Sequence, residues 1–126
     1  MANYKILIVD DDFAMRQILK NIIATVGKFD IREAENGYKA LELMMEDPPD
    51  VVFLDVFMPV LTGVETLQLM KKIEKLNSVK VIVCSAEGNF STVQKALEFG
   101  AKDFIRKPFE MKTVVNKAKK WILDEI

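Results

Sequence analysis

Short apolar runs alternate along this chain with longer segments in which apolar residues recur at helical spacing. The runs predict strands at residues 6–9, 30–34, 50–55, 80–84 and 103–106, the second being the weakest. The amphipathic segments that follow them predict five helices. Strands that alternate with helices favour a parallel sheet with helices packed on its faces. With right-handed crossovers this is a (βα)5 sandwich, a flavodoxin-like doubly wound α/β fold.

Helix boundaries follow from residues that start or stop helices. Asp12 and Asn36 are expected to cap the first two helices, which Gly27 and Pro48-Pro49 end, and Gly63 opens the third. Apolar side chains of the last helix and several methionines are expected to fill the core: Met111, Val114, Val115, Ala118, Trp121 and Ile122, together with Met44, Met45 and Met70.

Composition limits the classes of protein to which the chain can belong. Its 126 residues suit one domain, and a formal net charge of −1 gives no overall field for nucleic acid or an anionic membrane. We interpret the lysines of the last helix as a solvated face. No apolar run reaches the roughly 20 residues of a membrane span, and no signal segment is recognisable. A single cysteine fits a reducing compartment, so a soluble cytoplasmic protein is expected.

Reactive side chains lie where four of the five predicted strands end. The acidic triplet 10–12 follows the first strand, Asp55 closes the third, Ser85 follows the fourth and Lys107 the fifth. Parallel strands bring their carboxyl ends to one edge of the sheet, where open α/β folds bind ligands. Like charges gathered at such an edge are costly unless a cation lies among them. The pattern therefore indicates a divalent metal ion and a phosphoryl group.

The chemistry of these groups suggests a role for each. Mg²⁺ prefers oxygen ligands and is usually held by one or two carboxylates together with a phosphate. Asp11 and Asp55 are candidate direct ligands, Asp10 a ligand through water, and a backbone carbonyl just past Asp55 a further one. Asp55 is also the candidate nucleophile, forming an acyl phosphate. The metal and Lys107 would neutralise the phosphoryl oxygens, and Ser85 could donate a hydrogen bond to one of them. Because the chain has no histidine, imidazole chemistry must come from a partner.

Four motifs in this order and at this spacing closely resemble the receiver domain of two-component response regulators, including the single-domain chemotaxis regulators. The resemblance covers the chain from Lys5 to the last helix. The motifs are Ile8-Val9-Asp10-Asp11-Asp12, then Leu54-Asp55-Val56-Phe57-Met58-Pro59 with Gly63 following, then Cys84-Ser85-Ala86, and finally the run from Gly100 to Phe109.

The resemblance implies a strand order of 2-1-3-4-5 and a phosphorylation site. Asp55 would be the phosphoacceptor, and Asp10 and Asp11 would be acidic residues of a site for Mg²⁺ or Mn²⁺. The backbone carbonyl of Phe57 would be a further metal ligand. Phe57 is also one of two residues expected to tune the hydrolysis of the acyl phosphate, and the other is Glu87.

The resemblance also implies a switch. Lys107 would be the counter-ion of the phosphoryl group, in a cis peptide bond with Pro108, and Ser85 would be the switch hydroxyl. Phe104 matches the switch aromatic, which is often tyrosine in the family. Serine stands where threonine is common, so the rotamer of the hydroxyl is less restricted. Phe104 lacks a hydroxyl, so a partner contact that needs its hydrogen bond is absent.

The sequence is therefore interpreted as a signalling module rather than a turnover enzyme, one that promotes only its own phosphorylation and dephosphorylation. A sensor histidine kinase or a histidine phosphotransfer protein would supply the phosphoryl group. The surface of the fourth helix, fifth strand and fifth helix would then contact an unidentified downstream protein. We expect residues 1–126 to form one receiver domain without an output domain, as a stand-alone regulator or an excised part. We expect a monomer without direct nucleic-acid contact or membrane insertion, and leave open dimerisation on activation.

Three other interpretations fit fewer of the residues. An aspartyl-phosphate phosphatase would be expected to carry Asp-x-Asp on its first strand and an inserted cap, whereas the triplet 10–12 is contiguous. A flavin or nucleotide site needs a loop that cradles phosphate, and three carboxylates there would repel it. A degenerate receiver that only binds partners would not need the intact set of acidic residues, hydroxyl and lysine.

Overall fold

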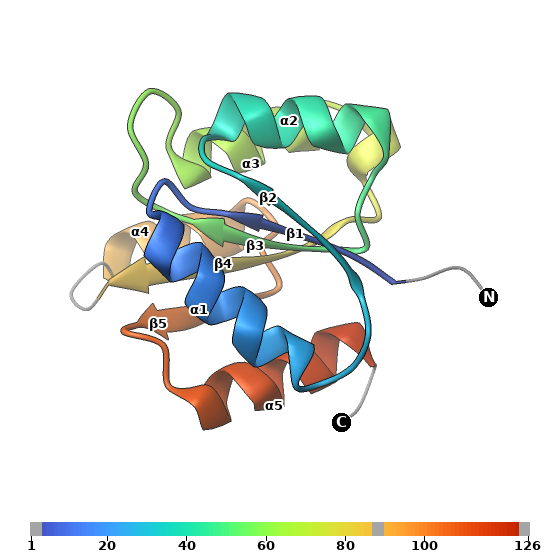
Figure 1. Ribbon diagram of the computed structural model, residues 1–126. Helices are drawn as coiled ribbons and strands as arrows, with labels where there is room; N and C mark the ends of the chain where they lie inside the picture. The colour runs from blue at the N-terminus through green and yellow to red at the C-terminus, as the bar shows by residue number, and fades with distance from the viewer. Residues whose placement is uncertain (1–3, 87–89, 124–126) are drawn as a thin grey trace.

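The computed structural model describes residues 4–86 and 90–123, which form a single parallel sheet between two layers of helices (Figure 1). The strands are β1 (Lys5–Val9), β2 (Asp30–Ala34), β3 (Val51–Asp55), β4 (Lys80–Ala86) and β5 (Asp103–Lys107). The helices are α1 (Phe13–Ala24), α2 (Gly37–Glu46), α3 (Gly63–Lys71), α4 (Phe90–Glu98) and α5 (Met111–Ile122), with a short 3-10 turn, η1 (Glu74–Leu76).

The strand order is β2-β1-β3-β4-β5, and every neighbouring pair is parallel. This confirms the predicted flavodoxin-like fold and its order 2-1-3-4-5. The order reverses between β1 and β3, so their carboxyl ends diverge into loops on opposite faces and leave a crevice between them. The residues that end β1 and β3 therefore define the edge at which a ligand would bind.

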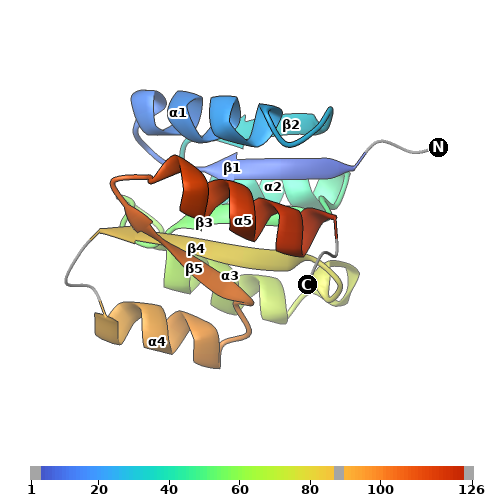
Figure 2. The same cartoon turned by 90° about the horizontal axis from the view of Figure 1, so that it is seen from below.

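Alternate side chains of each strand enter different halves of the core. Leu7, Val52 and Val81 face α2, α3 and α4, whereas Ile8 and Phe53 face α1 and α5. Figure 2 shows α1 and α5 lying across the face of the sheet opposite to α3 and α4. The central strand β3 is buried along its whole length because both of its faces are covered.

The predicted helix starts are confirmed. The Asp12 carboxylate accepts hydrogen bonds from the first turn of α1, and the Asn36 side chain accepts one from the Lys39 amide. Gly63 begins α3, preceded by a capping box between Thr62 and Glu65 that the prediction did not include. Helix α1 stops at Ala24, three residues before the glycine expected to end it.

Two residues predicted to be in the core are exposed. Met45 is 42% exposed, because it follows the fully buried Met44 and so lies about 100° further round α2. Met111 is 55% exposed and lies in the first turn of α5, ahead of the buried positions that begin at Val114. In the part of the chain that the structure describes, no helix is long and apolar enough to cross a bilayer.

Candidate functional site

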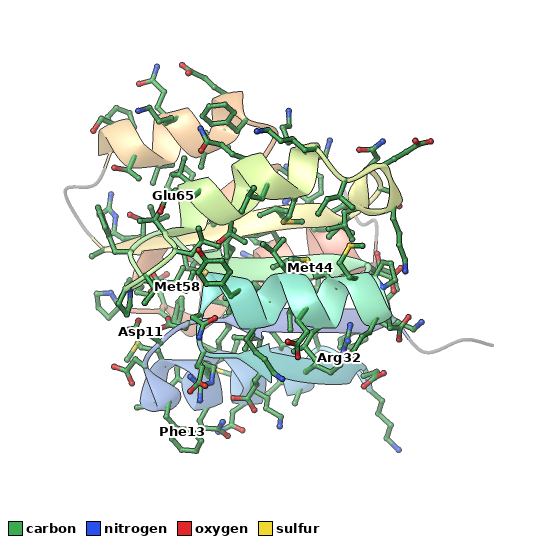
Figure 3. The ribbon with its side chains drawn as sticks, turned by 90° about the horizontal axis from the view of Figure 1, so that it is seen from above. Asp11, Phe13, Arg32, Met44, Met58 and Glu65 are labelled. Atoms are coloured by element: carbon green, nitrogen blue, oxygen red, sulfur yellow. The ribbon has the colours of Figure 1, made fainter. Side chains whose placement is uncertain are left out.

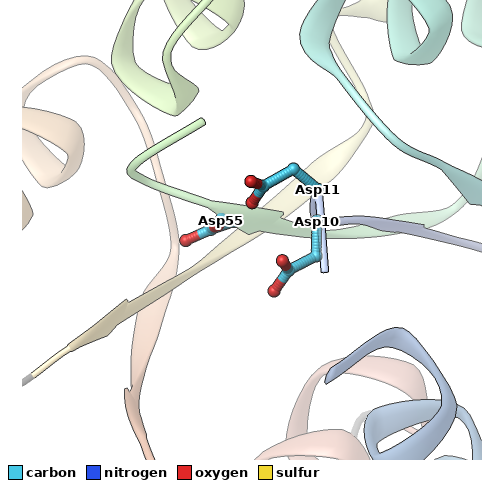
Figure 4. A group of neighbouring side chains, drawn as sticks. All are labelled: Asp10, Asp11 and Asp55. Carbon is cyan, nitrogen blue, oxygen red and sulfur yellow. The ribbon is translucent and has the colours of Figure 1, made fainter. Parts of the chain in front are cut away.

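The loops after β1 and β3 bring three acidic side chains together. Asp10, Asp11 and Asp55 each present a carboxylate oxygen within 4.8 Å of the others (Figure 4). Asp10 and Asp55 are 4% and 6% exposed, whereas Asp11 lies open to solvent. Figure 3 shows Asp11 beside the start of α1. The topology therefore gathers residues 45 positions apart into one partly buried anionic cluster.

Lys107, at the end of β5, points its ammonium group into this cluster. Its Nζ lies 2.7 Å from Asp10 Oδ2 and 3.2 Å from Asp55 Oδ1. Burial alone would lower the pKa of this lysine, but the two carboxylates outweigh it and raise the pKa above its ordinary value. Among the described residues, the cluster of Asp10, Asp11 and Asp55 thus sets three carboxylates beside the one ammonium group of Lys107, which leaves an excess of negative charge.

Asp55 is difficult to ionise in this environment. Burial, followed by repulsion from Asp10, raises the pKa of its carboxyl group to about 6, against the opposing attraction of Lys107. The Phe57 amide donates a hydrogen bond to Asp55 Oδ1 at 3.4 Å, which favours the ionised form only slightly. A cation placed among the three acids would remove the repulsion and leave Asp55 ionised.

The three acids fit a hard divalent cation. Carboxylate oxygens are the ligands that Mg²⁺ and Mn²⁺ prefer, and an exposed member such as Asp11 leaves room for the waters that Mg²⁺ retains. The acids border a hollow of about 360 Å³, whose other lining residues include Phe57 and Lys107. Asp55 therefore borders a hollow at the protein surface, beside the exposed Asp11.

The β1–α1 loop is braced from several directions. The Asp12 amide donates to Asp10 Oδ1 at 2.9 Å, and Arg16 Nη1 donates to the Asp10 carbonyl at 2.7 Å. Arg16 is itself held by Glu33 of β2, with 2.9 Å between Nε and Oε1. Sequence reasoning missed Arg16 and Glu33, since a charged pair on a helix and an outer strand looks like ordinary surface.

The β3–α3 loop depends on a close approach at Gly63. A Cβ atom at this position would lie 2.2 Å from the Asp55 carbonyl oxygen, so no other residue fits without moving the strand end. The Gly63 amide donates to the Val56 carbonyl at 2.9 Å. The start of α3 is thereby held directly against the end of β3, which positions Asp55.

Ser85 and Phe104 share one face of the sheet. Ser85 is buried on β4, and its hydroxyl donates to the Ala86 carbonyl at 3.2 Å rather than to an acidic side chain. In the β4–β5 register Ser85 pairs with Arg106, two residues after Phe104, so both side chains point toward the α4 side. Phe104 is half-buried. The two predicted switch residues are thus neighbours on adjacent strands.

The remaining predicted residues lie around the rim. Phe57 is 54% exposed and borders the hollow, and the Lys107-Pro108 peptide bond is cis, as expected. Glu87, the second residue expected to tune hydrolysis, lies outside the described residues. The roles given to these residues remain predictions.

The chain matches known proteins along most of its length. The model of the response regulator receiver domain matches residues 6–119. Chemotaxis protein CheY of Thermotoga maritima is 43% identical over 111 residues, which are 88% of this chain and 91% of that protein. Sporulation initiation phosphotransferase F of Bacillus subtilis is 34% identical over 122 residues, covering 97% and 96% of the two chains.

Solved structures agree with these matches. The receiver domain of NtrX from Brucella abortus has a TM-score of 0.84 at 31% identity, with 95% of this chain and 99% of that chain covered. Chemotaxis protein CheY4 of Vibrio cholerae has a TM-score of 0.86 at 26% identity, with the same coverage.

Proposed function

Since the chain belongs to the response regulator receiver family, whose members accept phosphoryl groups in two-component signalling, we propose that Asp55 is the phosphoacceptor of this protein. One observation supports this most strongly. Asp55 is the acid that ends the central strand, among two further acids and a lysine that approaches within 3.2 Å. An aspartate that only caps a helix or lies on the surface would not need two further acids and a lysine beside it.

The proposed step moves one phosphoryl group from a partner's phosphohistidine. An Asp55 carboxylate oxygen forms the new P–O bond while the P–N bond breaks, and the imidazole nitrogen leaves with the bonding electron pair. The donor histidine belongs to a sensor kinase or a histidine phosphotransfer protein, because this chain contains none. A bound Mg²⁺ or Mn²⁺ would supply positive charge to the phosphoryl oxygens in the transition state.

Asp10, Asp11 and the Phe57 carbonyl are the groups that we assign to metal binding together with Asp55. Asp10 and Asp55 are buried and already paired with Lys107, so they hold their positions before a cation binds. Such pre-organisation means that little reorientation accompanies phosphoryl transfer.

Lys107 and Ser85 would change partners when Asp55 is modified. The added phosphoryl group carries two negative charges or nearly so, and it competes with Asp10 for the Lys107 ammonium group. The Ser85 hydroxyl would leave the Ala86 carbonyl and donate to a phosphoryl oxygen. Phe104 would then turn into the space on the same sheet face, which alters the surface of α4, β5 and α5.

We further propose that this surface contacts a downstream protein, and that the chain works as a single receiver domain over residues 1–126. In this role it promotes only its own phosphorylation and dephosphorylation and turns over no other substrate. It would act as a monomer, without direct contact with nucleic acid.

The test uses acetyl phosphate, a small phosphodonor, with and without Mg²⁺, and intact mass as the readout. We expect a Mg²⁺-dependent phosphoryl adduct on the native chain and none on Asp55→Asn. An adduct of equal yield on Asp55→Asn would contradict the assignment. Turnover of a small phosphate ester in the same assay would instead favour a phosphatase.

A further inference from the structure

A lysine of α5 approaches the aromatic ring of Phe104. The ring packs on the face of the sheet that α4 covers, whereas α5 lies on the opposite face. Lys117 reaches past the edge strand β5, and its Nζ lies 4.5 Å from the centre of the Phe104 ring. The same ammonium group donates to the Phe104 carbonyl and, at 3.0 Å, to Asp103 Oδ1. One lysine thus contacts both the ring and the backbone of a single residue.

Asp103 fixes the position of this lysine. Its other oxygen, Oδ2, accepts a hydrogen bond of 2.9 Å from Trp121 Nε1, and the Phe104 amide donates to Oδ1 at 2.8 Å. Burial would raise the pKa of Asp103, but these donors outweigh it and keep the carboxyl group ionised. The Asp103 carboxylate of β5 therefore accepts from three donors, and two of them, Lys117 and Trp121, belong to α5. The Lys117 ammonium group is also the one that lies against the Phe104 ring.

We propose that Lys117 is a positioning residue that holds the Phe104 ring in the orientation seen here, through the Asp103–Lys117–Trp121 cluster. The inference rests on the proposed function, in which Phe104 moves when Asp55 is phosphorylated. A ring that turns toward Ser85 leaves the ammonium group, so the cation–π contact opposes the movement. The cluster biases the unphosphorylated protein toward its resting state.

The Phe104 ring borders a hollow on the side of Lys117. About 270 Å³ of space is bordered by Phe104 and Lys117 together with Arg106, Pro108, Glu110 and Thr113. The ring packs against the core on the α4 side. On the side of this hollow it is not closely packed, and its contact there is with Lys117. A cation–π contact at a partly exposed site is worth about 0.5–1 kcal/mol, which corresponds to a roughly 2- to 5-fold shift between two orientations.

The test compares three variants of the full chain: Lys117→Met, Lys117→Arg and Lys119→Met. Lys117→Met keeps the length of the side chain but removes the charge, and Lys117→Arg keeps a cation that can lie over the ring. Lys119→Met removes one charge from the same helix, at an exposed position with no contact to Phe104 among the described residues. The single tryptophan supplies a resolved indole N–H signal that reports whether its contact with Asp103, and hence the fold of α5, is intact.

The readout is the fluorine resonance of 4-fluorophenylalanine placed at position 104, first without and then with acetyl phosphate and Mg²⁺. Without phosphodonor, we expect Lys117→Met to move the resonance toward its phosphorylated position, by a population shift of about 2- to 5-fold. Lys117→Arg and Lys119→Met should stay near the native position. A resonance unchanged in Lys117→Met, or moved equally in Lys119→Met, would overturn the inference. If the native chain takes up no phosphoryl group, the proposed function fails. A change of the resonance in Lys117→Met that neither Lys117→Arg nor Lys119→Met shares would then still show that Lys117 positions the ring, and no such change would overturn the inference.

Discussion

The ammonium group of Lys107 lies 2.7 Å from Asp10 Oδ2, although 97 positions of sequence separate the two residues. Both side chains are largely buried, so water and salt weaken this ion pair less than they would weaken a surface pair. The lysine that we assign to the phosphoryl group is therefore engaged before phosphorylation. In the proposed function, phosphorylation of Asp55 would draw this ammonium group away from Asp10.

Replacing Lys107 with methionine should separate phosphoryl transfer from metal binding. The variant keeps the length of the side chain but loses the charge that would neutralise the phosphoryl oxygens, so labelling by acetyl phosphate should slow about 10-fold or more. Mg²⁺ affinity should be unchanged or higher, because a cation that competes for Asp10 and Asp55 is gone. Labelling rates at saturating Mg²⁺ and a Mg²⁺ titration followed by calorimetry measure the two effects. Parallel losses of labelling and metal affinity would show that Lys107 serves the metal site instead.

Replacing Asp55 with asparagine should stabilise the metal-free protein at neutral pH. The folded state raises the pKa of this carboxyl group from 3.8 to about 6, so folding favours the neutral form. Well below pH 3.8 the aspartic acid is neutral in both states, and the substitution should change stability little. As the pH rises from 3.8 to about 6, the unfolded state releases this proton while the folded state retains it, so the native protein loses stability relative to the variant, and the loss levels off above pH 6.

Urea unfolding in the presence of a chelator, from pH 4 to pH 7.5, measures this difference. We expect the variant to gain about 1–2 kcal/mol at pH 7, after allowance for solvent screening. Other acids titrate in both proteins, so only the difference between the two curves reports Asp55. A difference that is constant over this pH range would contradict the proposed environment of Asp55.

Asp11 and Asp12 are neighbours with different expected roles. Asp11→Asn should weaken Mg²⁺ binding about 10-fold or more, because it removes a carboxylate from the cluster of three. Asp12→Asn is the matched control, since it removes the same charge from the same loop and retains a good helix cap. Adding Mg²⁺ should raise the melting temperature of the native protein and of the control, and removing it with a chelator should reverse the rise. Equal losses of affinity in both variants would indicate a diffuse electrostatic effect rather than a specific ligand.

The backbone at Val60 is strained, and a substitution that relieves the strain should raise the free energy of unfolding. Its φ angle is 72°, in the left-handed region that β-branched residues rarely adopt, and its side chain is 81% exposed. Val60→Asn should stabilise the protein by about 1 kcal/mol, because asparagine tolerates this conformation and little packing is lost. Val60→Ala, which gains less, is the control. Thermal melts that give the same stability for both variants would argue against strain as the cause.

The sequence allowed the position of the site to be predicted, because parallel strands fix where their ends lie. Asp10 and Asp55 end neighbouring strands, and Lys107 ends a strand two places further along the sheet. No knowledge of side-chain packing was needed to place them at one edge. The same argument explains why Ser85 was expected near the site, whereas Phe104 was expected as the switch aromatic only through the resemblance to receiver domains.

Contacts that depend on side-chain direction could not be predicted in this way. Lys117 was interpreted as part of a solvated face, yet it reaches past β5 to Phe104 and Asp103. Trp121 was expected to pack α5 onto the sheet; it is half-buried there and also donates to Asp103. Helical spacing identifies which face of a helix is buried, but it does not identify where a long side chain at the boundary of that face will end.

The central claim is that phosphate is carried by Asp55, and the most direct measurement locates the modified residue. The native protein is labelled with acetyl phosphate and Mg²⁺, reduced with borohydride, which converts an aspartyl phosphate to homoserine, and sequenced as peptides by mass spectrometry. The account predicts homoserine at position 55 and unmodified aspartate at positions 10 and 11. Homoserine at either of those positions, with aspartate retained at 55, would contradict it.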